Sequence, residues 1–228
     1  MKHLVVLSGS GISAESGIKT FREMGGLWEQ YDVTEVASPT GWARDRSVVL
    51  RFYNERRKAL LDAEPNAAHY GLVELEKHFQ VSIVTQNVDD LHERAGSSNI
   101  LHLHGEIRKA QCTENPNKVY NIEGWELKEG DLSEDGYQLR PNVVWFGEAV
   151  PAMNEAVPIV NQADILVVIG TSLNVYPAAG LINYTSPGTA IYVIDPGQPV
   201  GIENMNVTFI NKKATEGILE LKELLLKD

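Results

Sequence analysis

Residues 4–22 read LVVLSGSGISAESGIKTFR, an apolar run that breaks into small residues and then into polar ones. The apolar residues 4–7 predict a short parallel strand that is buried on both faces. The residues after them fit the G-x-G-x-x-G/A pattern: Gly9, Ser10, Gly11, Ile12, Ser13 and Ala14. In this pattern the glycines permit a tight bend and a close approach of backbone N–H groups to a pyrophosphate. We therefore expect a phosphate site here, facing the N-terminus of the following helix.

The acidic residue that usually binds the ribose of a dinucleotide is missing from its expected place, about 20 residues further along the chain. Residues 25–28, Gly-Gly-Leu-Trp, occupy that region and predict a loop. Taken alone, the glycine pattern also fits a plain turn in some other α/β protein. A nucleotide site at this turn would therefore differ from that of an ordinary dehydrogenase.

The composition is that of a globular protein, with 228 residues of which 43% are hydrophobic. This length suffices for one large domain, or for one domain with a smaller insertion. Apolar runs such as residues 165–169 are far shorter than the ~20 residues that span a bilayer. Because residues 1–3 lead directly into the first strand, we expect a cytoplasmic protein with no signal peptide and no membrane segment.

The formal net charge of −11 opposes nonspecific binding to nucleic acid, which is a polyanion. The same charge would attract a lysine-bearing peptide; alternatively, it serves only solubility. The chain has one cysteine, Cys112, which excludes an internal disulfide and a zinc site built from several cysteines.

Strand and helix patterns alternate along the chain. After the first strand, strands are expected at residues 81–85, 100–103, 143–146, 164–169, 190–194 and 207–210. Helices are expected at residues 45–61, 66–78 with Pro65 suited to the first turn, 151–163 with a kink at Pro158, 177–184 and 215–226. Residues 24–40 predict a long loop, and residues 108–139, which lose this periodicity, predict an inserted surface subdomain. The alternation predicts an α/β fold with a doubly wound, Rossmann-like parallel sheet.

Small and polar residues follow several of the expected strands: residues 9–13, residues 86–89, His104 and residues 170–172. Because parallel strands end at one edge of a sheet, these residues should meet there. His102 is expected to have a packing role rather than a catalytic one, as are His69, His78 and His92.

Five blocks of sequence together resemble the sirtuins, the NAD-dependent protein lysine deacylases. They are GSGISAESGIKTFR at 9–22, TQNVDDLHERAG at 85–96, LHLHGE at 101–106, PNVVWFGE at 141–148 and GTSLNVYPAA at 170–179. The resemblance implies a single catalytic domain, with a Rossmann-like core at approximately residues 1–22, 62–107 and 140–228. The small subdomain would comprise approximately residues 23–61 and 108–139.

The resemblance also implies the reaction and the residues that carry it. NAD would be the cofactor, acylated lysine side chains of proteins or peptides the substrate, and ADP-ribose the acyl acceptor, with release of nicotinamide. The phosphates and the adenosine side would be held by Gly9, Ser10, Gly11, Ile12, Ser13, Glu15, Arg22, Gly170, Thr171, Ser172, Asp195 and Ala214. The peptide would lie along Val144, Trp145, Phe146, Gly147 and Glu148.

Five further positions would surround the reacting ribose. Asp89 would bind the nicotinamide amide, while Gln86 and Asn87 would order the ribose and a water. Phe21 would shield the reactive carbon from solvent. His104 would be the base, since imidazole titrates near neutrality, and Asn87 would be the second catalytic residue.

Tyr53 and Arg56 are spaced i,i+3, so a helix places them on one face, where a phenol and a guanidinium can hold a single carboxylate. This Y-x-x-R resembles the motif of class III sirtuins, which remove succinyl and malonyl groups. The implied activity is desuccinylation and demalonylation, deacetylation, or both. Alternatively, Arg56 is one of several cations on a solvated helix face.

Two features depart from the family. Sirtuins commonly carry four cysteines that bind a structural zinc, whereas only Cys112 stands in that region here. No metal is therefore expected, and the subdomain must hold by ordinary packing or be partly mobile. An asparagine usually meets the adenosine ribose where this chain has Asp195, whose carboxylate can accept from both ribose hydroxyls.

Other functions could use the same pocket. An ADP-ribosyltransferase or an NAD hydrolase would need no acyl channel, so the block at residues 144–148 favours a deacylase over these enzymes. Loss of His104 or Asn87 would favour a non-catalytic NAD-sensing module, and both residues are present.

Overall fold

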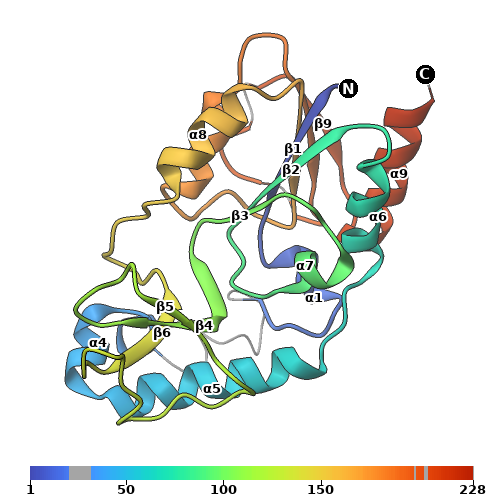
Figure 1. Ribbon diagram of the computed structural model, residues 1–228. Helices are drawn as coiled ribbons and strands as arrows, with labels where there is room; N and C mark the ends of the chain where they lie inside the picture. The colour runs from blue at the N-terminus through green and yellow to red at the C-terminus, as the bar shows by residue number, and fades with distance from the viewer. Residues whose placement is uncertain (21–31, 198, 203–204, 228) are drawn as a thin grey trace.

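The computed structural model describes residues 1–20, 32–197, 199–202 and 205–227. Within this part of the chain, six strands form a parallel sheet in the order β3-β2-β1-β7-β8-β9 (Figure 1). They are β1 (His3–Ser8), β2 (Gln80–Thr85), β3 (Ile100–His102), β7 (Ile165–Ile169), β8 (Ala190–Ile194) and β9 (Val207–Ile210). The chain winds outward from β1 in both directions, which confirms the doubly wound sheet. In such sheets the ligand binds where the strand order reverses, here beside β1.

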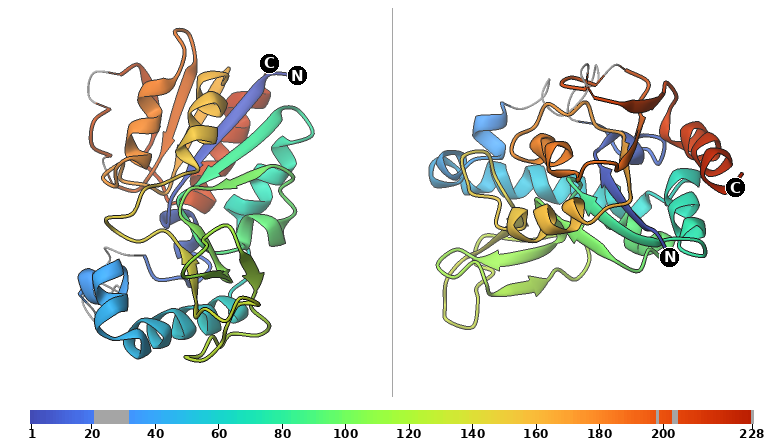
Figure 2. Two further views of the ribbon diagram at one scale, coloured as in Figure 1. Left: turned by 60° about the vertical axis from the view of Figure 1, so that its left-hand side comes forward. Right: turned by 90° about the horizontal axis from the view of Figure 1, so that it is seen from above.

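Alternate residues of β1 serve the two faces of this sheet, as the period of a strand requires. Leu4 and Val6 belong to the core beneath α6 (Ala67–Leu75) and α9 (Ala214–Leu226). Val5 and Leu7 belong to the core beneath α8 (Met153–Asn161) and the 3-10 helix η1 (Ala178–Tyr184). Figure 2 shows helices on both faces of the sheet. All four of these side chains are 0% exposed, so burial on both faces explains the uninterrupted apolar run.

A second, smaller unit lies at the carboxyl ends of the strands, at the bottom of Figure 1. Its described strands are antiparallel in the order β5-β4-β6 and comprise β4 (Gly105–Cys112), β5 (Val119–Asn121) and β6 (Leu139–Val143). Its helices include α3 (Val33–Val36), α4 (Pro39–Arg44) and the long α5 (Arg46–Asp62). These elements share an apolar core that includes Phe52, Ile107 and Leu139. The predicted combination of a Rossmann-like sheet and a smaller subdomain is confirmed.

A buried arginine joins the parts of this subdomain. Arg57 is 0% exposed and donates from Nε to the Ile107 carbonyl (2.6 Å) and from Nη1 to the Trp125 carbonyl (2.7 Å) and Asn54 Oδ1 (2.7 Å). Asn54 in turn pairs with the backbone of Leu127, donating to its carbonyl (2.9 Å) and accepting from its N–H (3.0 Å). Burial lowers the pKa of Arg57 to about 10, so the guanidinium keeps its charge at neutral pH. These bonds fasten α5 to β4 and to the loop after β5.

Several predicted elements differ from the structure. The predicted strand at 143–146 is wrong: the strand is β6, which ends at Val143 and belongs to the small sheet. The predicted loop at 24–40 contains α3 and the beginning of α4 in its described part. Pro65 does not lie in a first helical turn, because α6 begins at Ala67 and Asn66 is its N-cap. The helix predicted at 177–184 is a 3-10 helix, and α7 (Leu91–Ala95) was not predicted.

The remaining helices agree with the sequence more closely. Asp45 caps α5 by accepting from the Val48 N–H (3.1 Å), which explains why the helix starts there. Pro158 lies inside α8, as expected, although α8 is shorter than the predicted range. In the described part of the chain, no helix has the length and apolar character needed to cross a membrane.

Candidate active site

Three loops meet where β1, β2 and β7 end, as the sequence predicts. The N–H of Gly9 donates to the Ile169 carbonyl (3.0 Å), and the N–H of Gly11 donates to the Gly170 carbonyl (2.8 Å). A Cβ atom on Gly11 would lie 2.8 Å from the Gly170 Cα, and Gly170 itself has a φ of +64°. Both positions therefore need glycine, because two backbones pass there without room for a side chain. The two loops therefore pack backbone against backbone at this edge of the sheet.

The helix after the first loop is shorter than the sequence suggests. α1 (Gly11–Ala14) has four residues, a single turn, and Ser10 is its N-cap. A single turn aligns few peptide dipoles, so the field expected from a helix N-terminus is small here. An anion at this loop would depend mainly on direct contacts with N–H groups and hydroxyls.

A buried polar cluster connects the first two loops. Ser13 Oγ donates to Asp89 Oδ2 (3.0 Å) and accepts from Asn87 Nδ2 (3.2 Å). The other carboxylate oxygen of Asp89 accepts from the Leu91 N–H (3.2 Å). Burial raises the pKa of Asp89, and its hydrogen bonds and the charge of His102 oppose that rise. Gln86 reaches the third loop, where its Nε2 donates to Thr171 Oγ1 (3.1 Å).

His104 lies beside this cluster in a state suited to accepting a proton. Its Nδ1 is 3.0 Å from the Gln86 carbonyl oxygen, which can only accept a hydrogen bond. Nδ1 therefore carries the hydrogen, and Nε2 keeps its lone pair. Burial lowers the pKa of His104, which favours the neutral ring at physiological pH. A neutral imidazole with its Nε2 lone pair available is the form of a general base.

His102, for which the sequence predicts packing rather than catalysis, is largely buried and makes two polar contacts. Its Nδ1 lies 2.8 Å from the Asn87 carbonyl oxygen, and its Nε2 lies 2.7 Å from Glu93 Oε1 on α7. His102 is the last residue of β3, and His104 lies in the bend between β3 and β4. His102 contacts the Asn87 carbonyl, and His104 contacts the carbonyl of the preceding residue, Gln86.

The residues predicted to bind the acyl group and the peptide lie at the other end of the site, in the small subdomain. Tyr53 is 1% exposed, and its hydroxyl accepts from Trp145 Nε1 (3.0 Å). The guanidinium carbon of Arg56 lies 6.0 Å from the centre of the Tyr53 ring. Burial lowers the pKa of Arg56 and the nearby Tyr53 and Asp89 raise it, while burial raises the pKa of Tyr53 to about 12. At neutral pH this end therefore presents a phenol and a cation.

The segment that carries Trp145 is anchored on both sides. Val144 N–H donates to the His104 carbonyl (2.9 Å), and Phe146 N–H donates to the Ala37 carbonyl (3.0 Å). Glu148 accepts from the Trp145 N–H (2.8 Å) and pairs with Arg140 (2.8 Å). The Arg140 guanidinium carbon lies 4.0 Å from the centre of the Trp145 ring. Phe146 and Gly147 are exposed, so this anchored segment presents two of its residues to solvent.

The other predicted cofactor-binding residues lie around the same edge. Asp195 follows β8, is half-buried and accepts from the Gly197 N–H (2.8 Å). Glu15 accepts from the N–H (3.0 Å) and hydroxyl (2.8 Å) of Thr215, which occupies its carboxylate at the start of α9. Ala214 is buried beside it, at the first position of α9. Phe21 and Arg22 lie outside the described residues.

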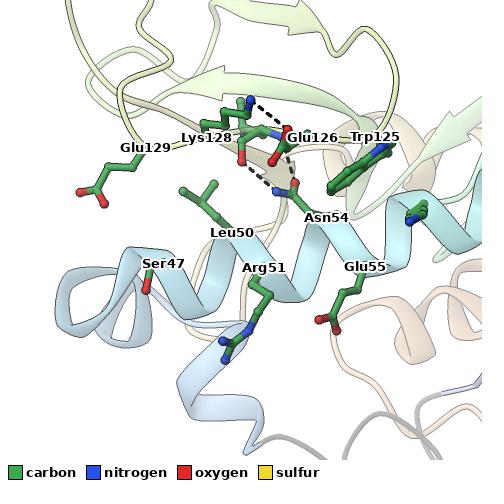
Figure 3. Close-up of a pocket in the computed structure, with 11 residues that line it drawn as sticks. Ser47, Leu50, Arg51, Asn54, Glu55, Trp125, Glu126, Lys128 and Glu129 are labelled. Atoms are coloured by element: carbon green, nitrogen blue, oxygen red, sulfur yellow. Dashed lines mark hydrogen bonds and ion pairs between the residues drawn. The ribbon is translucent and has the colours of Figure 1, made fainter.

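A groove of about 460 Å³ lies elsewhere, between α5 and the loop after β5. It is lined by Ser47, Leu50, Arg51, Asn54, Glu55, Lys58, Trp125, Glu126, Leu127, Lys128 and Glu129. Figure 3 shows Asn54 reaching from α5 to the loop, while Arg51 and Glu55 point away from it. None of the predicted site residues is among these described lining residues, so the groove is separate from the strand ends.

Sequence reasoning missed two features of the site. One is the contact of Glu93 with His102, and the other is the indole of Trp145 behind Tyr53. Trp145 and Tyr53 are 92 positions apart, and no local pattern reports such a contact. The only sequence feature that points to Glu93 is that it lies in the same block, residues 85–96, as Asn87.

Comparisons with known proteins agree with this geometry. A model of the Sir2 family matches residues 9–177. An NAD-dependent protein deacylase of Bacteroides thetaiotaomicron is 54% identical over 232 residues, covering 99% of this chain and 99% of that protein. An NAD-dependent protein deacylase of Helicobacter pylori is 55% identical over 227 residues, covering 100% of this chain and 97% of that protein.

Solved structures give the same picture. A Sir2 homologue crystallised with NAD superposes with a TM-score of 0.89 at 40% identity, covering 99% of this chain and 90% of that one. A Sir2 protein solved with a deacetylated p53 peptide and 3′-O-acetyl ADP-ribose gives a TM-score of 0.83 at 30% identity, covering 97% and 92%. The likeness therefore extends over almost the whole chain.

Proposed function

The chain belongs to the Sir2 family and is an NAD-dependent protein deacylase, and on that premise we propose that it removes succinyl and malonyl groups, as well as acetyl groups, from lysine side chains. The observation that carries the acyl preference is the contact of Trp145 Nε1 with the Tyr53 hydroxyl (3.0 Å), beside Arg56. We also propose the cytoplasm as its place of action, as expected from the sequence.

We call the loops at residues 9–13, 86–89 and 170–172 the nucleotide edge. The nucleotide edge fits NAD because it offers closely packed glycines and short polar side chains rather than bulky ones. Any Cβ at Gly9 or Gly11 would lie within 2.8 Å of the third loop, so the two backbones can approach this closely only with glycine. Gly9, Gly11, Ser13, Thr171 and Ser172 would hold the phosphates, and Asp195 the adenosine ribose. When bound, NAD supplies an electrophilic carbon, C1′ of its nicotinamide ribose, for attack by the acyl oxygen.

The chain's own part in the chemistry is to orient groups and move one proton. Asp89 and Asn87 would hold the nicotinamide amide and the ribose, in positions fixed by Ser13. His104 would accept a proton from a ribose hydroxyl at Nε2, while Nδ1 stays bonded to the Gln86 carbonyl. Positioning and a matched base are the contributions that a protein makes to such group transfers.

The acyl end would recognise a carboxylate by two different donors. Because the Tyr53 oxygen already accepts from Trp145, its own hydrogen is directed elsewhere and can be donated to an acyl carboxylate. Arg56 would add a charge-assisted bond, which is stronger in a desolvated setting than at an exposed surface. An acetyl group has no carboxylate and would gain nothing from either donor.

Product analysis tests this function. The protein would be incubated with NAD and peptides of one sequence that carry acetyl-, succinyl- or malonyl-lysine, and the products identified by mass spectrometry. We expect the free-lysine peptide, nicotinamide and the matching O-acyl-ADP-ribose for each substrate. Modification of protein by ADP-ribose, or free ADP-ribose without deacylated peptide, would overturn the proposal in favour of a transferase or hydrolase. Turnover of the acetyl peptide alone would overturn the acyl preference.

A further inference from the structure

Glu93 and His102 form a contact beside Asn87, in which the histidine is largely buried and the carboxylate is open to solvent. The His102 side chain is 8% exposed and that of Glu93 is 40% exposed. His102 comes from the end of β3 and Glu93 from α7, and the ring of His102 bridges Glu93 Oε1 (2.7 Å) and the Asn87 carbonyl oxygen (2.8 Å). The contact therefore links β3 and α7 to the backbone carbonyl of Asn87.

Both partners of this ring can only accept hydrogen bonds. A backbone carbonyl has no hydrogen to give, and an ionised carboxylate has none either. Both ring nitrogens of His102 must then donate, which requires the doubly protonated, cationic imidazolium. His104 makes one such contact and keeps its second nitrogen for a proton, so two histidines in one short segment are held in opposite states.

The electrostatic surroundings also favour the doubly protonated, cationic form of His102. Burial by itself would lower the pKa of His102, but Glu93, the Asn87 carbonyl and Glu106 outweigh it, and the pKa is raised. Lys109 pairs with Glu106 (2.6 Å), which moderates the effect of that carboxylate. Asp89 and His92 also face His102, and its charge lowers the pKa of both.

The backbone and side chain of Asn87 are fixed from three directions. Its N–H donates to Thr85 Oγ1 (3.0 Å), its Nδ2 donates to Ser13 Oγ (3.2 Å), and its carbonyl accepts from His102. The third bond sets the plane of the peptide that leads on to Asp89. Losing it would free that peptide to rotate, and both Asn87 and Asp89 would lose their orientation.

We propose that Glu93 and His102 act together as positioning residues, holding the main chain at Asn87 and Asp89 in the geometry that binds the nicotinamide half of NAD. This inference rests on the proposed roles of Asn87 and Asp89 and adds a pair that does not itself touch the reacting atoms. His104 remains the base. The pair acts through the backbone, and through the positive charge that it places near Asp89.

The test uses Glu93→Gln, which keeps an acceptor for His102 but removes the charge that holds its second proton. Its matched control is Glu64→Gln, which removes an exposed ion pair with Arg94 (2.9 Å) on the same helix α7. For Glu93→Gln we expect the KM for NAD to rise by about three- to tenfold with a smaller change in kcat, since a charge-assisted bond becomes a neutral one. In the plot of log(kcat/KM) against pH, the decline on the alkaline side should begin about one pH unit lower, because His102 then loses its proton more readily.

A second variant, His102→Phe, removes both bonds, and its KM for NAD should rise further than that of Glu93→Gln. If it does not fold, Glu93→Gln alone decides the matter. A Glu93→Gln enzyme with the wild-type KM and pH profile would overturn the proposal. So would a loss of activity that only parallels a loss of thermal stability. Wild-type turnover of acetyl- and succinyl-lysine is measured alongside, so that failure of the proposed function shows as an inactive wild type.

Discussion

At the nucleotide edge, the Gly11 N–H meets the Gly170 carbonyl at 2.8 Å, and the side chains between the loops are as short as those of Ser13 and Asn87. At the acyl end, the contacts are made by large side chains: Trp145 donates to Tyr53, and the Arg140 guanidinium lies over the Trp145 ring. The first region is backbone against backbone at the ends of buried strands. The second is part of the core of a separate small subdomain.

Substitutions in the two regions should therefore have different effects on activity. A change at the nucleotide edge alters a step that every acyl substrate shares. A change at the acyl end alters either the choice of acyl group or the stability of the small subdomain, while the nucleotide edge keeps its geometry. The predictions below use that division, beginning with the largest expected effect.

Replacing His104 with alanine should abolish the shared step. We expect His104→Ala to lower kcat by about 100-fold or more for acetyl- and succinyl-lysine alike, the usual scale for a positioned acid or base. NAD binding, measured by calorimetry, should remain close to that of the wild type. Near wild-type turnover would remove His104 from the mechanism, and loss for one acyl group only would contradict the division between the two regions.

Removing the buried guanidinium of Arg57 should affect the small subdomain. Arg57→Met leaves the buried Ile107 carbonyl and the partly buried Trp125 carbonyl without this donor. We expect the free energy of unfolding to fall by about 2–4 kcal/mol, since the unsatisfied buried carbonyl costs about 1–3 kcal/mol and the partly buried one costs about 1 kcal/mol. Arg51→Met, on the exposed side of the same helix, should change it by less than about 0.5 kcal/mol. Equal urea midpoints for the two variants would show that Arg57 does not hold the subdomain together.

Acid should weaken the sheet side of the molecule through His69. This side chain is 0% exposed and its ring lies 5.0 Å from that of His92, and burial lowers the pKa of His69 to about 4. The unfolded chain binds a proton at this residue below about pH 6.5, and the folded chain resists it. Stability is therefore lost as the pH falls from about 6.5 towards about 4.

From pH 7 to pH 5 the contribution of His69 to this loss is about 2 kcal/mol. His69→Gln cannot titrate, so its urea-unfolding free energy should fall by that much less over the same interval. His78→Gln, at an exposed position of the same region, should retain the wild-type pH dependence. Identical slopes for His69→Gln and the wild type would contradict the assignment.

Chelation should have no effect. Structural zinc sites take four Cys or His ligands, the chain has a single cysteine, and the described residues contain no group of three or more His, Cys, Asp or Glu side chains that could hold a metal. We expect no stoichiometric zinc by elemental analysis and an unchanged melting temperature in excess chelator. One zinc per chain, together with a lower melting temperature after chelation, would refute this.

Most of the sheet could be predicted because buried parallel strands give uninterrupted apolar runs. Residues 165–169 and 190–194 were located almost residue by residue for this reason. β6 was misplaced because it is half-buried, with Leu139, Pro141 and Val143 inward and Arg140 and Asn142 between them. A proline within that alternation argues against a strand, while the apolar residues just after it imitate one.

The meeting of strand ends could also be predicted, since topology alone brings them to one edge. The contacts that fix each side chain could not. Tyr53 lies 92 positions from Trp145, and Arg57 lies 50 positions from Ile107, so neither contact leaves a local pattern. The protonation states of His102 and His104 likewise depend on the acceptors that their rings contact, and the residue types alone do not reveal those contacts.

The most direct test of the account is the ratio of kcat/KM for succinyl-lysine to that for acetyl-lysine, in the wild type, in Arg56→Met and in the control Arg51→Met. Loss of the charge-assisted bond from Arg56 predicts a fall of roughly ten- to a hundredfold for the succinyl substrate with little change for the acetyl one. Arg51→Met should keep the wild-type ratio. If both activities of Arg56→Met fell together, or if the wild type never accepted succinyl-lysine, the acyl end would not be a carboxylate site.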